Sequence, residues 1–89
     1  MTDKDIFETA IKVYGVLNQE NMAIEECAEL IQAINKKHRG RRHNIPEEIA
    51  DVEIMLEQLK IANGCHEEVE AIRKEKVERL YTNIFEECI

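Results

Sequence analysis

The sequence predicts an all-α fold, for three reasons. Helix-forming residues dominate the 89-residue chain, which has only three glycines and one proline. Apolar residues recur at helical spacing in four segments, and no strand-like alternation is sustained. Residues that favour turns fall between these segments. We therefore predict one domain over residues 1–89, with a small four-helix bundle-like protomer.

The first two helices are predicted from their start and stop signals. The first covers residues 3–17, with Thr2 as its N-cap and Asp5 in the capping-box region. The polar run 18–21 is expected to break the chain. A second helix then covers residues 22–38.

The third and fourth helices follow a basic loop at residues 36–43. Asn44 is a good N-cap for the third helix, and Pro46 falls in its first turn. This helix is expected to end at the Asn63-Gly64 pair. The last helix is predicted over residues 66–87.

Composition excludes several classes of partner. The chain has 12 basic and 19 acidic residues, a net charge of -7, which argues against non-specific binding of nucleic acid. No segment approaches the roughly 20 apolar residues of a membrane span, so no membrane association is expected. Because so short a chain buries a limited core, association with a second copy is expected.

The cysteines and the N-terminus favour a cytoplasmic location. Cys27, Cys65 and Cys88 are odd in number and form no C-x-x-C pair, which indicates reduced, mostly buried thiols. The first residues lack the basic and apolar regions of a signal peptide.

Two acidic clusters are the most informative feature of the chain. Glu25, Glu26 and Glu29 form an E-E-x-x-E pattern, and Glu48 and Asp51 form an E-x-x-D pattern after the loop. Residues three apart lie on one side of a helix, so two packed helices can direct four carboxylates to one place. Such a group requires a cation, and oxygen ligands favour Mg²⁺ or Mn²⁺.

A helical wheel separates the acids of the third helix. Its apolar stripe consists of Val52, Met55, Leu56 and Leu59. Glu48 falls within this stripe and Asp51 lies at its margin, whereas Glu53, Glu57 and Lys60 lie on the opposite side. A solvated acidic face therefore explains Glu53 and Glu57, but it explains Glu48 and Asp51 poorly, because isolated interior charges are costly.

The second helix leaves two interpretations open. Its predicted buried side consists of Cys27, Leu30, Ile31 and Ile34. Glu25, Glu26 and Glu29 fall beside that side, so they suit either a metal site or a solvated face. Of the three, Glu26 lies nearest the apolar edge.

The paired motif, Glu25-Glu26-x-x-Glu29 followed by Glu48-x-x-Asp51, resembles that of the MazG-like nucleoside triphosphate pyrophosphohydrolases, in the all-α NTP pyrophosphatase superfamily. The match covers roughly residues 20 to 63. The resemblance implies Mg²⁺-dependent cleavage of a (d)NTP to the (d)NMP and pyrophosphate. It also implies that Glu26, Glu29, Glu48 and Asp51 bind the metal.

The resemblance leaves the catalytic base open. Glu25 matches the first position of the motif, where a metal ligand, a supporting group or a base would each fit. A carboxylate left free of metal can take the proton of the attacking water, so Glu25 and Glu26 are the candidates.

Basic residues are candidates for binding the substrate phosphates. Lys76 and Arg79 cluster on one side of the last helix, where the resembled family commonly carries such residues. Lys36 and Arg39 are the candidates in the basic loop. For both pairs a solvated surface is the competing interpretation. Because sites in this superfamily are often completed by a neighbouring chain, we expect a homodimer, with a tetramer as the alternative.

Two other functions remain open at this stage. One is a non-catalytic helical module that binds metal or a partner, and the other is a phosphoribosyl-ATP pyrophosphatase. A di-iron carboxylate protein is disfavoured, because no histidine stands at E-x-x-H spacing from the acids. The base and sugar of the substrate and the number of metal ions are not determined by these patterns.

Overall fold

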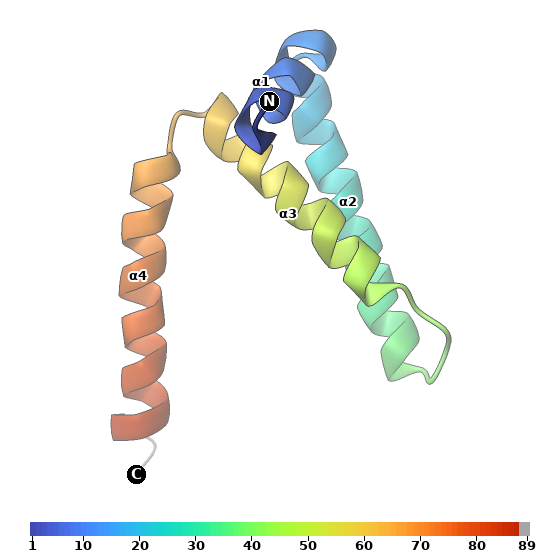
Figure 1. Ribbon diagram of the computed structural model, residues 1–89. Helices are drawn as coiled ribbons and strands as arrows, with labels where there is room; N and C mark the ends of the chain where they lie inside the picture. The colour runs from blue at the N-terminus through green and yellow to red at the C-terminus, as the bar shows by residue number, and fades with distance from the viewer. Residues whose placement is uncertain (88–89) are drawn as a thin grey trace.

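The computed structural model describes residues 1–87 and confirms an all-α fold with four helices (Figure 1). The elements are α1 (Asp3–Tyr14), α2 (Val16–His38), α3 (Ile45–Ala62), α4 (His66–Thr82) and a π-helical turn, η1 (Asn83–Glu87). The helices α2 and α3 form an antiparallel hairpin, α1 packs at its open end, and α4 leads away from the end of α3 (Figure 1). Over the part of the chain described, no helix has the length and apolarity needed to span a membrane.

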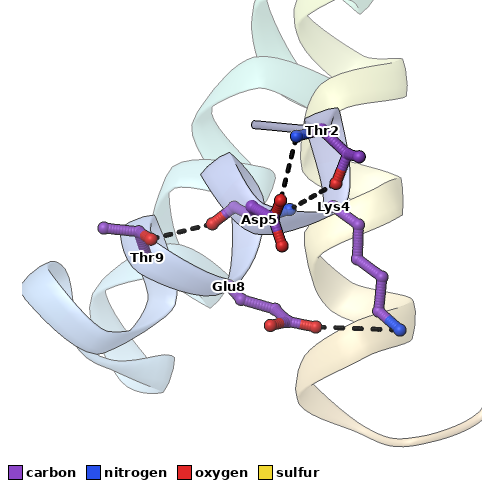
Figure 2. A network of polar contacts seen from close by, with 5 residues as sticks. All are labelled: Thr2, Lys4, Asp5, Glu8 and Thr9. Atoms are coloured by element: carbon purple, nitrogen blue, oxygen red, sulfur yellow. Dashed lines mark hydrogen bonds and ion pairs between the residues drawn. The ribbon is translucent and has the colours of Figure 1, made fainter.

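A reciprocal capping box begins α1, as predicted. The Asp5 backbone N–H donates to Thr2 Oγ1 at 3.2 Å, and the Thr2 N–H donates to the Asp5 carboxylate at 2.9 Å (Figure 2). The hydrogen bond from the Thr2 backbone N–H to the carboxylate is the main cause that lowers the pKa of Asp5. The Thr9 hydroxyl donates to the Asp5 carbonyl at 2.8 Å, and Lys4 Nζ lies 3.8 Å from the carboxylate of Glu8 (Figure 2). The first turn is thereby fixed.

The break between the first two helices lies at Gly15, so the predicted break at residues 18–21 is wrong. Gly15 adopts φ 88° and ψ 153°, a conformation that only glycine adopts readily. Its N–H donates to the Ile11 carbonyl at 2.8 Å, and its own carbonyl accepts from the Gln19 N–H at 3.1 Å. The polar run continues α2, because such residues each cost a helix less than about 1 kcal/mol.

Small and polar side chains form the contact between α2 and α3. Ala23 and Ala33 of α2 and Met55 of α3 are buried. Beside them, Gln19 Nε2 donates to Gln58 Oε1 at 2.7 Å, and Gln58 Nε2 lies 3.9 Å from the sulfur of Met55. The alanines allow the two helices to approach closely, and the two amides satisfy part of each other's hydrogen-bonding capacity.

Several large apolar side chains of α2 point outward, contrary to prediction. Ile31 is 60 % exposed, Cys27 and Ile34 are also exposed, and only Leu30 of the predicted buried side is partly buried. The helix carries apolar residues on two sides. Packing against α3 uses the side with the alanines, which leaves the aliphatic side uncovered.

The faces of α3 match the helical wheel more closely. Met55 and Glu48 are buried, and Val52 and Leu59 are partly buried. Leu56 is an exception, since it is exposed. Lys60 is another, because its ammonium lies 2.7 Å from Glu57 Oε1 and its side chain is largely covered.

The cysteines are less buried than predicted. Cys27 is exposed and Cys65 is partly buried, and both are free thiols. Cys88 lies outside the described residues. The prediction of mostly buried thiols is therefore wrong for Cys27, while that of reduced thiols stays a prediction.

Candidate metal centre

Four predicted site residues lie on facing parts of α2 and α3. Glu26 and Glu29 are about one turn apart in the middle of α2, and Glu48 and Asp51 are about one turn apart near the start of α3. Because the two helices run antiparallel, the first turns of α3 pack beside this part of α2 (Figure 1).

Three of these carboxylates converge. One oxygen from each of Glu26, Glu29 and Glu48 lies within 4.8 Å of the other two. The Glu48 residue is only 6 % exposed, Glu26 is partly buried, and Glu29 is exposed at the edge of the group. Asp51 is partly buried and contributes to the raised pKa of Glu26. We call these four residues the carboxylate cluster.

Two buried oxygens of the cluster have no partner. Glu48 Oε1 accepts a hydrogen bond from Asn44 Nδ2 at 2.7 Å, but Glu48 Oε2 has no partner among residues 1–87. The Oε2 atom of Glu26 is likewise buried without a partner there. An unsatisfied buried carboxylate oxygen is costly, and nearly all such atoms in folded proteins are paired. Either atom could accept a cation or a hydrogen-bond donor.

Burial and electrostatic repulsion both disfavour ionisation of the carboxylates in the cluster. Burial is the main cause that raises the pKa of Glu26, followed by repulsion from Glu29, Asp51 and Glu48 and by the hydrogen bond with Asp51. Burial also raises the pKa of Glu48, with further repulsion from Glu29 and Asp51, although the hydrogen bond from Asn44 opposes the rise. The group therefore resists full ionisation unless positive charge is supplied.

Asn44 has a role that the sequence did not reveal. It occupies the predicted N-cap position of α3, but its side chain makes no capping bond to the helix backbone. Its amide donates to Glu48 at 2.7 Å and, more weakly, to Glu47 Oε2 at 3.4 Å. The four-residue spacing between Asn44 and Glu48 was the available signal, since such pairs meet on a helix.

The other predicted site residues lie outside the cluster. Glu25 is exposed and does not belong to the convergent group. Lys36 and Arg39 are exposed at the end of α2, and Lys76 and Arg79 are exposed on α4, which stands apart from α2 (Figure 1). The two ion pairs found in residues 1–87 lie elsewhere, so no cation of that region neutralises the cluster.

The donor set suits a hard divalent cation. All four groups are carboxylates, and Mg²⁺ and Mn²⁺ prefer oxygen ligands. The two unpartnered oxygens would be satisfied by such an ion.

Comparisons with protein-family models, with curated proteins and with solved structures gave no match. A functional assignment must therefore rest on the geometry of the carboxylate cluster and on its sequence motif.

Proposed function

We propose that this chain is a divalent-cation-dependent nucleoside triphosphate pyrophosphohydrolase, which cleaves a (d)NTP to the (d)NMP and pyrophosphate. The observation that carries the proposal is the pair of buried, unpartnered oxygens of Glu26 and Glu48 within a group of like charges. The E-E-x-x-E and E-x-x-D motifs, which resemble those of MazG-like enzymes, support the choice of substrate class.

Glu26, Glu29, Glu48 and Asp51 would hold Mg²⁺, or Mn²⁺ in its place. When bound, the ion neutralises the substrate phosphates and the charge that develops as the phosphoanhydride breaks. Asn44 fixes the orientation of Glu48 through its 2.7 Å hydrogen bond.

The reaction needs a water that attacks the α-phosphorus and a group that takes its proton. A bond forms from the water oxygen to the α-phosphorus as the bond to the bridging oxygen breaks, and pyrophosphate leaves with that electron pair. Glu26 and Glu25 are the proposed acceptors of the proton. Glu26 lies within the cluster, and its raised pKa favours its acceptance of a proton, whereas Glu25 is exposed beside it.

Two pairs of basic side chains are proposed to bind the remaining phosphates of the substrate. Lys36 and Arg39 lie at the end of α2, on the same hairpin as the cluster. Lys76 and Arg79 lie on α4, away from α2, and would reach a substrate only through association of chains (Figure 1). The proposed enzyme is a homodimer, with a tetramer as the alternative assembly.

The test is pyrophosphate release from a panel of NTPs and dNTPs, with and without Mg²⁺. Activity on at least one nucleotide is expected, and Glu48→Gln and Asp51→Asn should each remove it without changing the helix content. Glu47→Gln is a matched control, because Glu47 neighbours Glu48 and is exposed. Release from none of the nucleotides would count against the proposal. Activity on phosphoribosyl-ATP alone would move the assignment to that related reaction.

A non-catalytic metal-binding or interaction module is the second candidate. The exposed aliphatic side of α2 favours it, since Leu17, Ile24 and Ile31 are all more than half exposed. Metal binding without any nucleotide hydrolysis would support this module. If neither Mg²⁺ nor Mn²⁺ changes the melting temperature, the proposed metal site would be wrong for both candidate functions.

A further inference from the structure

The helix α4 lacks the packing that a helix of its length needs. Among residues 1–87, α4 contacts α3 near its own beginning and the η1 turn that continues it, and every residue from Glu70 to Tyr81 is exposed. Val77 is 51 % exposed and Leu80 is 56 % exposed. Most helical stability in proteins comes from packing of an apolar face. We therefore expect α4 to pack against another protein surface.

One face of α4 combines apolar and basic side chains. It forms a shallow hollow of about 440 Å³, lined by Val69, Ile72, Arg73, Lys76, Val77 and Leu80. No acid lines this hollow, because the glutamates of α4 lie around the rest of the helix. We call it the basic face of α4.

A groove beside α1 and α3 has apolar and acidic lining residues, which complement the basic face of α4. It measures about 1050 Å³ and lies between α1, α3 and the start of α4. Phe7, Ile54 and Ile61 provide apolar surface in it. Its acids are Asp3, Glu8, Glu53, Glu57 and Glu67, and its lysines are Lys4 and Lys60. Both lysines are already paired with glutamates of the groove, which leaves an acidic excess.

The chain exposes more surface than a compact monomer of its mass, as expected if a second copy covers part of it. The accessible surface is 7246 Å², whereas a compact monomer of 10.4 kDa exposes about 5,400 Å². The radius of gyration is 16.4 Å, against about 12 Å for a compact domain of this length. The excess of roughly 1,800 Å² per chain matches the share that each partner buries in an obligate dimer.

We propose that the basic face of α4 docks in the α1–α3 groove of a second copy, and that the second copy returns the same contact. One twofold axis then buries both helices and both grooves. Within one chain, α4 leads away from the end of α3 instead of lying in that groove, which favours the groove of a second copy (Figure 1). The inference does not depend on the proposed catalysis. It engages Lys76 at the groove, so that Lys36, Arg39 and Arg79 remain the candidate cations for substrate.

Charge reversal on the two surfaces tests the proposal. Glu53→Lys places a lysine in the groove, and Lys76→Glu places an acid on the basic face of α4. Each variant alone brings like charges together, so each should weaken the dimer by about tenfold or more. Mixing the two variants should restore the wild-type affinity, because in the mixed dimer both contacts pair opposite charges. Analytical ultracentrifugation across a concentration series measures all three.

Lys74→Glu and Glu20→Lys are matched controls, since Lys74 does not line the hollow and Glu20 does not line the groove. Both should leave the dimer unchanged. A monomeric wild type, or a dimer indifferent to both reversals, would overturn the proposal. So would restoration in the double variant but not in the mixture, because that result places α4 in the groove of its own chain. Catalytic activity is not part of the readout, so failure here is distinct from failure of the proposed enzyme.

Discussion

Asn44 Nδ2 donates a 2.7 Å hydrogen bond to Glu48 Oε1, and the second oxygen of that carboxylate has no partner among residues 1–87. The amide therefore holds Glu48 in one orientation while leaving its other oxygen available. This pairing joins the start of α3 to the carboxylate cluster. It also lowers the cost of keeping Glu48 ionised, since the bond opposes the rise in its pKa.

Asn44→Ala should weaken Mg²⁺ binding by about tenfold, because groups that orient a metal ligand typically contribute 10- to 100-fold to affinity. Isothermal titration calorimetry with Mg²⁺ or Mn²⁺ measures the change. Asn35→Ala, at an exposed position on α2, is the control and should bind as the wild type does. Equal affinities of Asn44→Ala and wild type would show that this hydrogen bond does not prepare the site.

Glu48→Gln should raise the melting temperature of the metal-free protein, because it removes a buried negative charge from a group of like charges. The same change should remove most of the stabilisation that Mg²⁺ gives the wild type. Thermal unfolding with EDTA and with Mg²⁺ separates the two effects. A variant that is destabilised without metal would indicate that Glu48 is favourably paired in the protein as it stands.

The stability of the metal-free protein should fall as pH rises through the folded-state pKa values of Glu26 and Glu48. Both values are raised above 4.5, so between 4.5 and the folded values the folded state binds more protons than the unfolded state. Their stabilisation is thus fully present below about pH 4.5 and is lost above the folded pKa.

Asp5 acts in the opposite sense. Its pKa is lowered below 3.8, so its contribution is lost as pH falls. The difference in unfolding free energy between wild type and Glu48→Gln, measured in EDTA from pH 4.5 to 7.5, isolates the part due to Glu48. A difference that does not change with pH would contradict the prediction. Mg²⁺ should stabilise the wild type more as pH rises, because it binds the ionised carboxylates.

Gln58→Leu should destabilise the protein by about 1–3 kcal/mol, because it leaves the buried amide of Gln19 without its 2.7 Å partner. Replacing both glutamines by leucine should cost less than the single change, since no unpaired polar group then remains. Urea unfolding of the two single variants and the double variant gives the coupling energy. Additive single effects would show that the two amides act independently.

Gly15→Ala should cost about 1–3 kcal/mol through backbone strain alone. Glycine holds φ 88° there, and nothing lies within 4 Å of where a Cβ would stand, so no clash is involved. Asn18→Ala is the paired control and should be neutral or slightly stabilising, because residue 18 lies inside α2. Urea unfolding compares both with the wild type. A larger loss of stability in Asn18→Ala than in Gly15→Ala would support a helix break at residues 18–21.

Local sequence signals predicted the ends of most helices. Thr2 and Asp5 form the expected capping box, Pro46 lies in the first turn of α3, and α3 ends before Asn63-Gly64. These signals succeed because each bond or conformation involves residues within about one turn. The break at Gly15 was missed because a polar run was given more weight than a single glycine.

The carboxylate cluster was predictable in part. The helical wheel of α3 correctly placed Glu48 inside, because α3 has one clear apolar stripe. Glu48 is only 6 % exposed. The wheel of α2 selected Cys27, Ile31 and Ile34 for the interior, and all three are exposed. Two apolar sides were available on that helix, and periodicity has no means of choosing between them.

The sequence by itself therefore determined the all-α class, most helix ends and the burial of Glu48, since these follow from neighbours along one helix. Only the tertiary structure decided that α2 faces α3 through Ala23 and Ala33, because that choice depends on how closely two helix backbones approach. It also decided that Asn44 binds Glu48 instead of capping the backbone, and that two oxygens of the cluster have no partner in the described chain. Both depend on side chains brought together by packing.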